Sequence, residues 1–391
     1  MCRSRAALLG RIGLVFLAGG GAPPAASWPG LGANADLAFV AYNNRVVAVS
    51  LADGKQAWSF PASPGGNSDQ FFADPGVSPE MIVVGSEGPT GSYSGALFGL
   101  DPATGEQQWC LAFDEKAAQR LNCPLTPTAT RAVFFGLMPP VDNRIVGGIS
   151  VVDGVAYFGM ANNSIYAVDA QTGEYLWEQA AKHPVWAAPA VDADTVYAVS
   201  LDHALYALER ATGRIKWTQE LGGMLVGTPA LVGDSLLVGT FGKRLVALDA
   251  ARQGAEQWTL STDNAVWSGP AVRDGVAYFT DLSGGLYAAD AATGALKWRQ
   301  TPGGVLRGSP AVAGELVFIG DKDGNLYARS AASGAEQWTQ KVAGDNPGQL
   351  LASPLAVPDR DLVLVAPYQG SNWLVAYTTG GALKWAFAPS Q

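Results

Sequence analysis

The chain has very few of the residues on which most enzymes depend. Its 391 residues include two histidines and three cysteines, and only 15% of them are charged. A Ser–His–Asp site would need His183 or His203, and no G-x-S-x-G nucleophile motif is present. No P-loop or dinucleotide fingerprint opens a helix either. We therefore predict no catalytic residues and no metal ligands, while a paired-carboxylate hydrolase site formed by converging loops stays open as an alternative.

The chain also lacks a basic region that could bind nucleic acid. Its formal net charge is −9, and no cluster of Lys and Arg is interleaved with aromatic residues. An acidic surface repels phosphate backbones, so we predict no nucleic-acid partner. The composition is instead rich in glycine, with 48 residues, and in tryptophan, with 12. Such a composition favours short strands joined by tight turns over helices.

The sequence has no apolar run long enough to predict a membrane span with confidence. Residues 1–26 contain Arg3 and Arg5, then an apolar stretch interrupted by Arg11, and then small residues. This order is typical of a secretory signal peptide, with an uncleaved anchor as the alternative. Gly20 stands where a lipid-attachment motif would place its cysteine. The pattern predicts a secreted, periplasmic or cell-envelope protein, without a lipid anchor or a transmembrane span in the mature chain.

The few cysteines divide into one in the predicted leader and two in the main part of the chain. Cys2 belongs to the leader, whereas Cys110 and Cys123 stand 13 residues apart in one segment. In an oxidising compartment these two could form a disulfide that closes a small loop and stabilises the fold by about 3 kcal/mol. Two free, buried thiols are the alternative. The spacing matches no zinc site, and no histidine pair accompanies it.

One phrase is repeated along the chain with little variation. It reads DAATGALKW at 290–298, and variants include DPATGEQQW at 101–109 and DAQTGEYLW at 169–177. Four of the seven gaps between successive phrases are 40 or 41 residues, which is the signature of a repeat architecture. A glycine lies four residues before the final tryptophan of every phrase, and these tryptophans are Trp58, Trp109, Trp177, Trp217, Trp258, Trp298, Trp338 and Trp385.

Each repeat contains the signals of four short antiparallel strands. In most repeats a proline opens the first strand, an apolar run follows, and a turn leads to a second apolar segment such as Leu326-Tyr327-Ala328. The glycine turn and the tryptophan strand complete the unit. Eight such units predict an all-β fold, an eight-bladed β-propeller of four-stranded antiparallel blades spanning residues 27–391. We expect a monomer in which the repeated tryptophans have a structural role and fill the gaps between blades.

The repeat resembles a known family. The pattern A-x-D-x-x-T-G-x-x-x-W, with LYA just before it, is similar to the tryptophan-docking repeat of quinoprotein (PQQ-type) propellers, and the BamB-like proteins of the outer-membrane β-barrel assembly machinery share that repeat. The resemblance covers residues from about 27 to 391. It implies a non-catalytic scaffold that binds a protein or peptide partner, in a BamB-like role in protein assembly at the cell envelope.

The same resemblance raises an alternative, a PQQ-binding or quinoprotein-type oxidoreductase. In that class the quinone lies under a disulfide of adjacent cysteines, and acidic and amide side chains hold calcium. This chain has no adjacent cysteines and no recognisable calcium-binding set. We therefore predict no cofactor, and PQQ with calcium remains the alternative.

The repeat is interrupted once by a long insertion. The gap from Trp109 to Trp177 is 68 residues, and the excess falls at 110–144, where a short helix is predicted near 116–121. We expect this insertion to project from one face of the ring. Irregular segments of a repeat protein are where binding sites are commonly found.

A second irregularity lies three residues before the strand-opening prolines. In different repeats this position holds Phe72, Trp186, Trp267 and Arg307. The first strand of a propeller blade is the innermost, so we predict that these four residues ring one mouth of the central channel. Such a ring would form a ligand or peptide site that is aromatic and carries one cation. The alternative is that bulky side chains simply close the channel.

Overall fold

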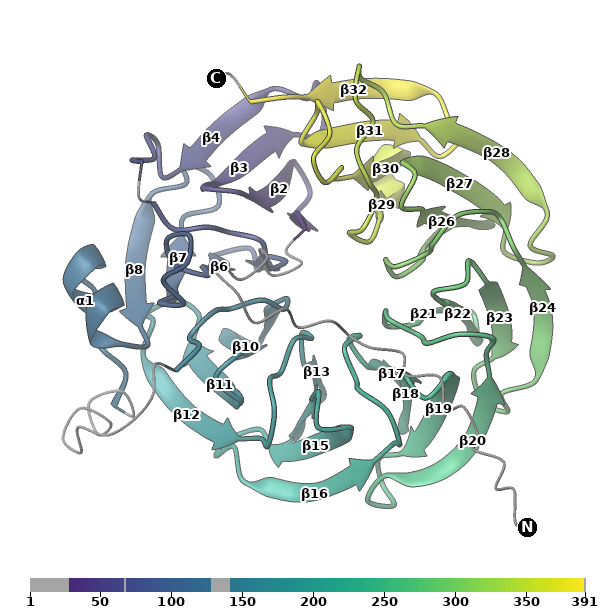
Figure 1. The fold of residues 1–391 in the computed structure, drawn as a ribbon, viewed down its shortest axis with the longest axis horizontal. Helices are drawn as coiled ribbons and strands as arrows, with labels where there is room; N and C mark the ends of the chain where they lie inside the picture. Colours follow the sequence, from purple (N-terminus) through teal and green to yellow (C-terminus); the bar gives the residue numbers. More distant parts are fainter. Residues whose placement is uncertain (1–27, 67, 128–140, 390–391) are drawn as a thin grey trace, which may run out of the picture.

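The computed structural model describes residues 28–66, 68–127 and 141–389. Eight four-stranded antiparallel sheets are arranged as blades around a central axis, which confirms the predicted eight-bladed β-propeller (Figure 1). Each blade uses its strands in chain order. The predicted leader, 1–26, and part of the insertion, 128–140, lie outside the described residues.

The first four blades contain sixteen strands. In each blade the first strand is short and lies nearest the channel. The sixteen strands are β1 (Gly30–Ala33), β2 (Leu37–Tyr42), β3 (Arg45–Ser50), β4 (Gln56–Phe60), β5 (Gly76–Val77), β6 (Ile82–Gly85), β7 (Ala96–Leu100), β8 (Gln107–Ala112), β9 (Ser150–Val152), β10 (Val155–Gly159), β11 (Ser164–Asp169), β12 (Tyr175–Ala180), β13 (Ala190–Val191), β14 (Thr195–Val199), β15 (Ala204–Glu209) and β16 (Ile215–Glu220).

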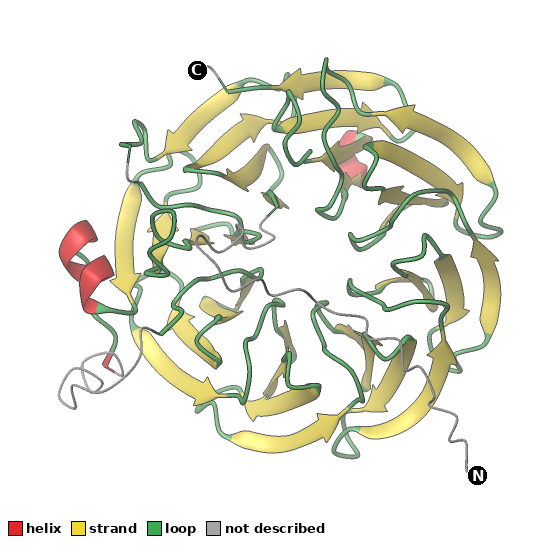
Figure 2. Ribbon diagram, in the orientation of Figure 1, coloured by secondary structure: helices red, strands yellow, loops and turns green. Residues whose placement is uncertain are grey.

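The second four blades repeat this arrangement. Their strands are β17 (Ala230–Val232), β18 (Ser235–Thr240), β19 (Arg244–Asp249), β20 (Ala255–Ser261), β21 (Ala271–Arg273), β22 (Val276–Thr280), β23 (Leu286–Asp290), β24 (Leu296–Gln300), β25 (Ala311–Ala313), β26 (Leu316–Gly320), β27 (Asn325–Ser330), β28 (Glu336–Lys341), β29 (Leu355–Val357), β30 (Leu362–Val365), β31 (Leu374–Thr378) and β32 (Leu383–Phe387). Figure 2 shows how little helix interrupts the described strands: α1 (Glu115–Leu121) and the 3₁₀ turn η1 (Pro358–Arg360).

The burial of each strand follows from its position in the blade. The first strands contact one another around the axis, as β21 and β25 do, so they are innermost as predicted. The second and third strands are almost wholly buried because neighbouring blades cover both faces of each sheet. The fourth strands alternate exposed and half-buried residues because only one of their faces meets a neighbour. No helix among the described residues is long and apolar enough to span a membrane.

The repeated phrase forms the turn that leads into the fourth strand. In the phrase DAATG the Oδ1 atom of Asp290 accepts hydrogen bonds from the amide and the hydroxyl of Thr293, at 3.0 and 2.9 Å. Asp101 and Asp169 make the same pair of bonds to the threonines of their own phrases. These bonds hold the pKa of Asp290 and of Asp101 below its usual value. The aspartate and threonine are therefore conformational residues of the turn.

The tryptophan that ends each phrase packs against the phrase of the following blade. Seven of the eight indole N–H groups donate to a backbone carbonyl of that blade at 2.8–3.2 Å. The glycine of the following phrase lies against the indole, and all eight such glycines have φ between +71° and +90°. Trp217 is the exception in hydrogen bonding, since the next phrase carries one extra residue before Gly254.

The ring closes by side-chain packing, without a strand exchanged between the two ends of the chain. Blade 8 (β29–β32) and blade 1 (β1–β4) are each built from continuous sequence. The Trp385 indole donates to the carbonyl of Leu51 at 3.1 Å, and the Tyr42 hydroxyl accepts the Gln369 amide at 2.8 Å. Apolar residues of both blades form one buried cluster across this junction. This packing joins blades 8 and 1 without a strand shared between them.

Residues 110–127 of the insertion lie along the outer edge of blade 2, and residues 141–144 contact the loop between β6 and β7. Because residues 128–140 lie outside the described part of the chain, projection of the insertion from one face stays a prediction. The helix α1 packs beside β8, as Figure 1 shows, and is capped by Asp114, which accepts the Ala117 amide at 2.8 Å. Cys110 of β8 and Cys123 after the helix form a disulfide with an S–S distance of 1.98 Å. The disulfide ties α1 to β8 and so prevents it from leaving the blade edge.

Candidate functional site

One mouth of the central channel contains a small cavity of about 100 Å³. The loops that precede the innermost strands form its wall, because these loops all turn at the same end of the ring. Each of the residues predicted to ring the mouth lines this cavity: Phe72, Trp186, Trp267 and Arg307. The cavity is small because these bulky side chains fill most of the mouth. The structure thus combines both sequence interpretations, a largely closed channel and a residual polar–aromatic site.

Arg307 is the cation of the mouth, and two indole rings flank its guanidinium. Its Cζ lies 3.8 Å from the ring centroid of Trp267 and 4.4 Å from that of Trp28, and the two rings are inclined at 66° to one another. No carboxylate of the described residues pairs with it, and its Nε is buried without a described hydrogen-bond partner. Burial lowers the pKa of Arg307 to about 10, so the side chain stays charged at neutral pH. The two indole rings stabilise the cation in place of a carboxylate.

The other predicted mouth residues contribute apolar wall and one further donor. Trp186 is half-buried, and its indole N–H is buried without a described partner. Phe72 packs edge-on against Tyr42 at 6.0 Å and therefore leans toward the core between blades 8 and 1. Trp267 is further supported by Phe241, at 5.2 Å between ring centroids. The wall therefore combines aromatic side chains with polar groups, and two of its donors, the Arg307 guanidinium and the Trp186 indole, have no described partner.

Two residues of the mouth were missed from the sequence, Trp28 and Asp74. Both stand directly before a proline that precedes the first strand, at Pro29 and Pro75. In the other blades this position holds a small residue, namely Gly148, Ala188, Thr228, Gly269, Ser309 or Ser353. The two departures from that pattern were therefore visible in the sequence. What the sequence could not show is that Trp28, from blade 1, reaches across the mouth to contact blades 6 and 7.

Asp74 is the one carboxylate in the cavity wall. Its Oδ1 accepts the Leu31 amide at 2.9 Å, and no ion pair joins it to Arg307. Protein atoms lie around Asp74 in the channel mouth, but its side chain is exposed to water there. Because this enclosure disfavours the charged form, the pKa of Asp74 rises to about 6, and the amide bond offsets only part of the rise.

Replacement of Asp74 by asparagine is expected to stabilise the fold at pH 7 and to leave its stability nearly unchanged at about pH 3, below the ordinary pKa of the carboxyl group. A carboxyl group with a raised pKa costs stability as the pH rises from its ordinary value of 3.8 through about 6. Asparagine is neutral throughout and can still accept the Leu31 amide. We expect a gain in stability on the order of 1 kcal/mol. This is well below the gain expected for a fully buried carboxylate, because channel water screens the charge.

Urea denaturation of both proteins at the two pH values measures this effect. Asp53→Asn is the control, and we expect it to lower the stability at pH 7 instead of raising it. Lys55 holds the pKa of Asp53 below its usual value, so this exposed pair favours the ionised form. An equal gain for Asp74→Asn at about pH 3 and at pH 7 would show that ionisation of Asp74 does not limit stability.

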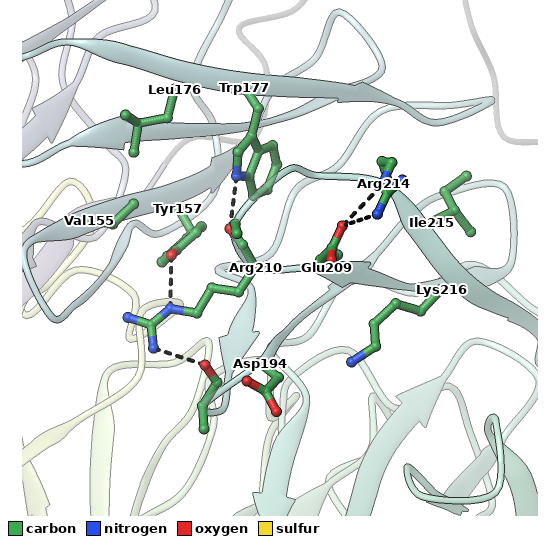
Figure 3. Close-up of a pocket in the computed structure, with 12 residues that line it drawn as sticks. Val155, Tyr157, Leu176, Trp177, Asp194, Glu209, Arg210, Arg214, Ile215 and Lys216 are labelled. Carbon is green, nitrogen blue, oxygen red and sulfur yellow. Dashed lines mark hydrogen bonds and ion pairs between the residues drawn. The ribbon is translucent and has the colours of Figure 1, made fainter.

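A larger hollow of about 880 Å³ lies away from the channel, between blades 3 and 4. Figure 3 shows the Arg210 side chain extending toward Tyr157, and Glu209 facing Arg214. The Arg210 Nε donates to the Tyr157 hydroxyl at 3.0 Å, and its Nη2 donates to Asp153 at 2.9 Å. These arginines have partners within the protein, so they hold neighbouring turns together. They leave no free cation comparable to Arg307.

Two aspartates of the other loops, Asp281 and Asp321, are held by structural hydrogen bonds. Asp281 is fully buried, where its carboxylate accepts bonds from the Tyr287 hydroxyl at 2.8 Å and from the Gly285 amide at 3.0 Å. Asp321 bonds Tyr327 in the same way, at 2.6 Å. Their structural partners explain the repeated tyrosine of the LYA segment. Among the described residues no three His, Cys, Asp or Glu side chains are placed to share a metal ion.

Comparison with known proteins gives one family and a common fold. The family model described as outer membrane protein assembly factor BamB matches residues 20–139, 100–261 and 250–388, and so nearly the whole chain. The crystal structure of BamB from Moraxella catarrhalis aligns with a TM-score of 0.68 at 17% identity, over 88% of this chain and 94% of that one.

A designed protein has a similar fold. The computationally designed Ika8 protein aligns with a TM-score of 0.69 at 11% identity, over 90% of this chain and 96% of that one. At these identities both structures show likeness of fold alone. No curated protein matches the chain in sequence.

Proposed function

Because this chain belongs to the family of the outer membrane protein assembly factor BamB, we propose that it is a non-catalytic scaffold that binds a protein or peptide partner at the cell envelope. The observation that carries the proposal is the channel mouth. There, four aromatic side chains and an arginine that pairs with no described carboxylate converge on one cavity. Aromatic residues and arginine are the side chains that contribute most to protein recognition.

The alternative of a PQQ-dependent oxidoreductase has no comparable support. A cavity of about 100 Å³ is too small for a tricyclic quinone carrying three carboxylates. The disulfide joins cysteines 13 residues apart at the outer edge of blade 2, far from the mouth in the ring. Asp74 is the only acidic residue in the described cavity wall, which does not suit a calcium site. The residues present therefore do not fit PQQ with calcium.

The envelope location rests on two observations. The Cys110–Cys123 disulfide is of a kind that persists in oxidising compartments such as the periplasm or the exterior. The leader-like pattern of residues 1–26 agrees with export. We place the protein in the periplasm or on the envelope, facing a protein partner there.

Site-directed photocrosslinking tests the proposed function. A benzophenone amino acid replaces Val226, which lines the mouth without contributing an aromatic ring or a charge. The control position is Leu296, which is 49% exposed on the outer strand of blade 6. In intact envelopes we expect a discrete protein adduct from position 226 that is absent at position 296, identified by mass spectrometry. Identical adducts at both positions, or none at either, would remove the mouth as a partner site.

A further inference from the structure

The channel mouth holds two hydrogen-bond donor groups without a described partner. No described residue accepts a hydrogen bond from the Arg307 guanidinium, and none accepts one from the indole N–H of Trp186. The Asp74 carboxylate in the same wall accepts the Leu31 amide and forms no ion pair with Arg307. An unpaired cation and a second donor in one cavity wall are complementary to an acceptor, and a partly buried cation favours an acceptor that is charged.

The geometry of Arg307 restricts which acceptor fits. Trp267 and Trp28 lie on two sides of the guanidinium, at 3.8 and 4.4 Å from its Cζ, with their rings at 66° to one another. A ligand can therefore approach only from the sides that the two indoles leave open. Two parallel N–H groups at the edge of a guanidinium match the two oxygens of a carboxylate. The indoles also limit the movement of the guanidinium, which reduces the ordering cost of binding.

We propose that the channel mouth binds a carboxylate group of its ligand at the edge of Arg307. This inference rests on the proposed function, because it names the chemical group by which a protein or peptide partner is recognised there. The carboxylate is that of a chain end or of an acidic side chain. The small cavity admits the group and little of the chain behind it.

Titration with small blocked amino acids tests this recognition directly. The probes are acetyl-glycine, which has a chain-end carboxylate, acetyl-aspartate amide, which has a side-chain carboxylate, and acetyl-glycine amide, which is neutral. The readout is the indole N–H signal of Trp267 and Trp186 in protein labelled with ¹⁵N at tryptophan, at pH 7 and constant ionic strength. We expect one or both carboxylate probes to shift these signals saturably, and the stronger of the two identifies the source. The neutral probe should leave the signals unchanged.

Two variants of Arg307 separate charge from geometry. Arg307→Gln should weaken binding of the carboxylate probes about tenfold or more, because it removes both the charge and the paired donors. Arg307→Lys keeps the charge but loses the planar fork, and it should give an intermediate affinity. The matched control is Arg299→Gln, which removes a guanidinium 5.4 Å from the Tyr287 ring outside the cavity. It should bind like the wild type.

The outcomes distinguish this inference from the proposed function. Equal shifts with the neutral probe, no shift with any probe, or unchanged binding by a folded Arg307→Gln protein would overturn carboxylate recognition. If Arg307→Gln does not fold, the Arg307→Lys affinity decides, because unchanged binding would exclude the paired geometry. A partner that still crosslinks equally well to Arg307→Gln at position 226 would leave the scaffold intact while overturning the role of Arg307. Absence of any adduct in the wild type would instead overturn the proposed function.

Discussion

Replacing Trp385 by alanine is expected to lower the free energy of unfolding by about 3–5 kcal/mol, the cost of removing a buried tryptophan. Trp385 is buried at the junction of blades 8 and 1, where its indole N–H donates to Leu51 at 3.1 Å and its ring lies against Gly54. The alanine variant leaves a cavity and an unpaired carbonyl at that junction. These blades are the first and last in the sequence, so no loop connects them to limit their separation.

Equilibrium denaturation of Trp385→Ala beside Trp217→Ala measures this effect. Trp217 ends the same phrase in blade 4, but it is half-buried and makes no hydrogen bond to a carbonyl of the next blade within the described structure. Blades 4 and 5 are also joined by the chain. We expect a smaller loss for Trp217→Ala, and protease cleavage near the ring junction in Trp385→Ala alone. Equal losses in the two variants would show that closure is no weaker than any other blade contact.

The fold could be predicted from the sequence because its determinants are local and repeated. Each phrase contains the aspartate, threonine and glycine of one turn and the tryptophan of one blade contact, so a single alignment of the chain with itself exposes the period. The extra residue before Gly254 is also visible in the sequence, but its consequence, the lost hydrogen bond of Trp217, is not. That consequence depends on how far one turn lies from the neighbouring blade.

The candidate site could be predicted only in part. A shared register before the innermost strands brings Trp186, Trp267 and Arg307 to one mouth, since propeller symmetry turns equal sequence positions into neighbours in space. The contact of Trp28 with Arg307 breaks that symmetry and joins blades that are not adjacent. Likewise, the charge state of Asp74 depends on enclosure by several loops at once. Neither can be obtained from one repeat compared with another.

Substituting alanine for Gly294, in the phrase DAATGALKW, is expected to cost about 2–4 kcal/mol of stability, from two separable causes. Its φ of +71° is strained for any residue with a Cβ, which costs about 1–2 kcal/mol. An added Cβ would also lie 2.5 Å from the Trp258 ring, so the indole must move away from the Ala291 carbonyl that it bonds at 3.2 Å. Gly275→Ala is the matched control, because that glycine has φ +73° with no atom within 4 Å of the added Cβ. The difference between the two variants in urea isolates the tryptophan contact, and equal losses would mean that backbone strain alone explains why every phrase keeps its glycine.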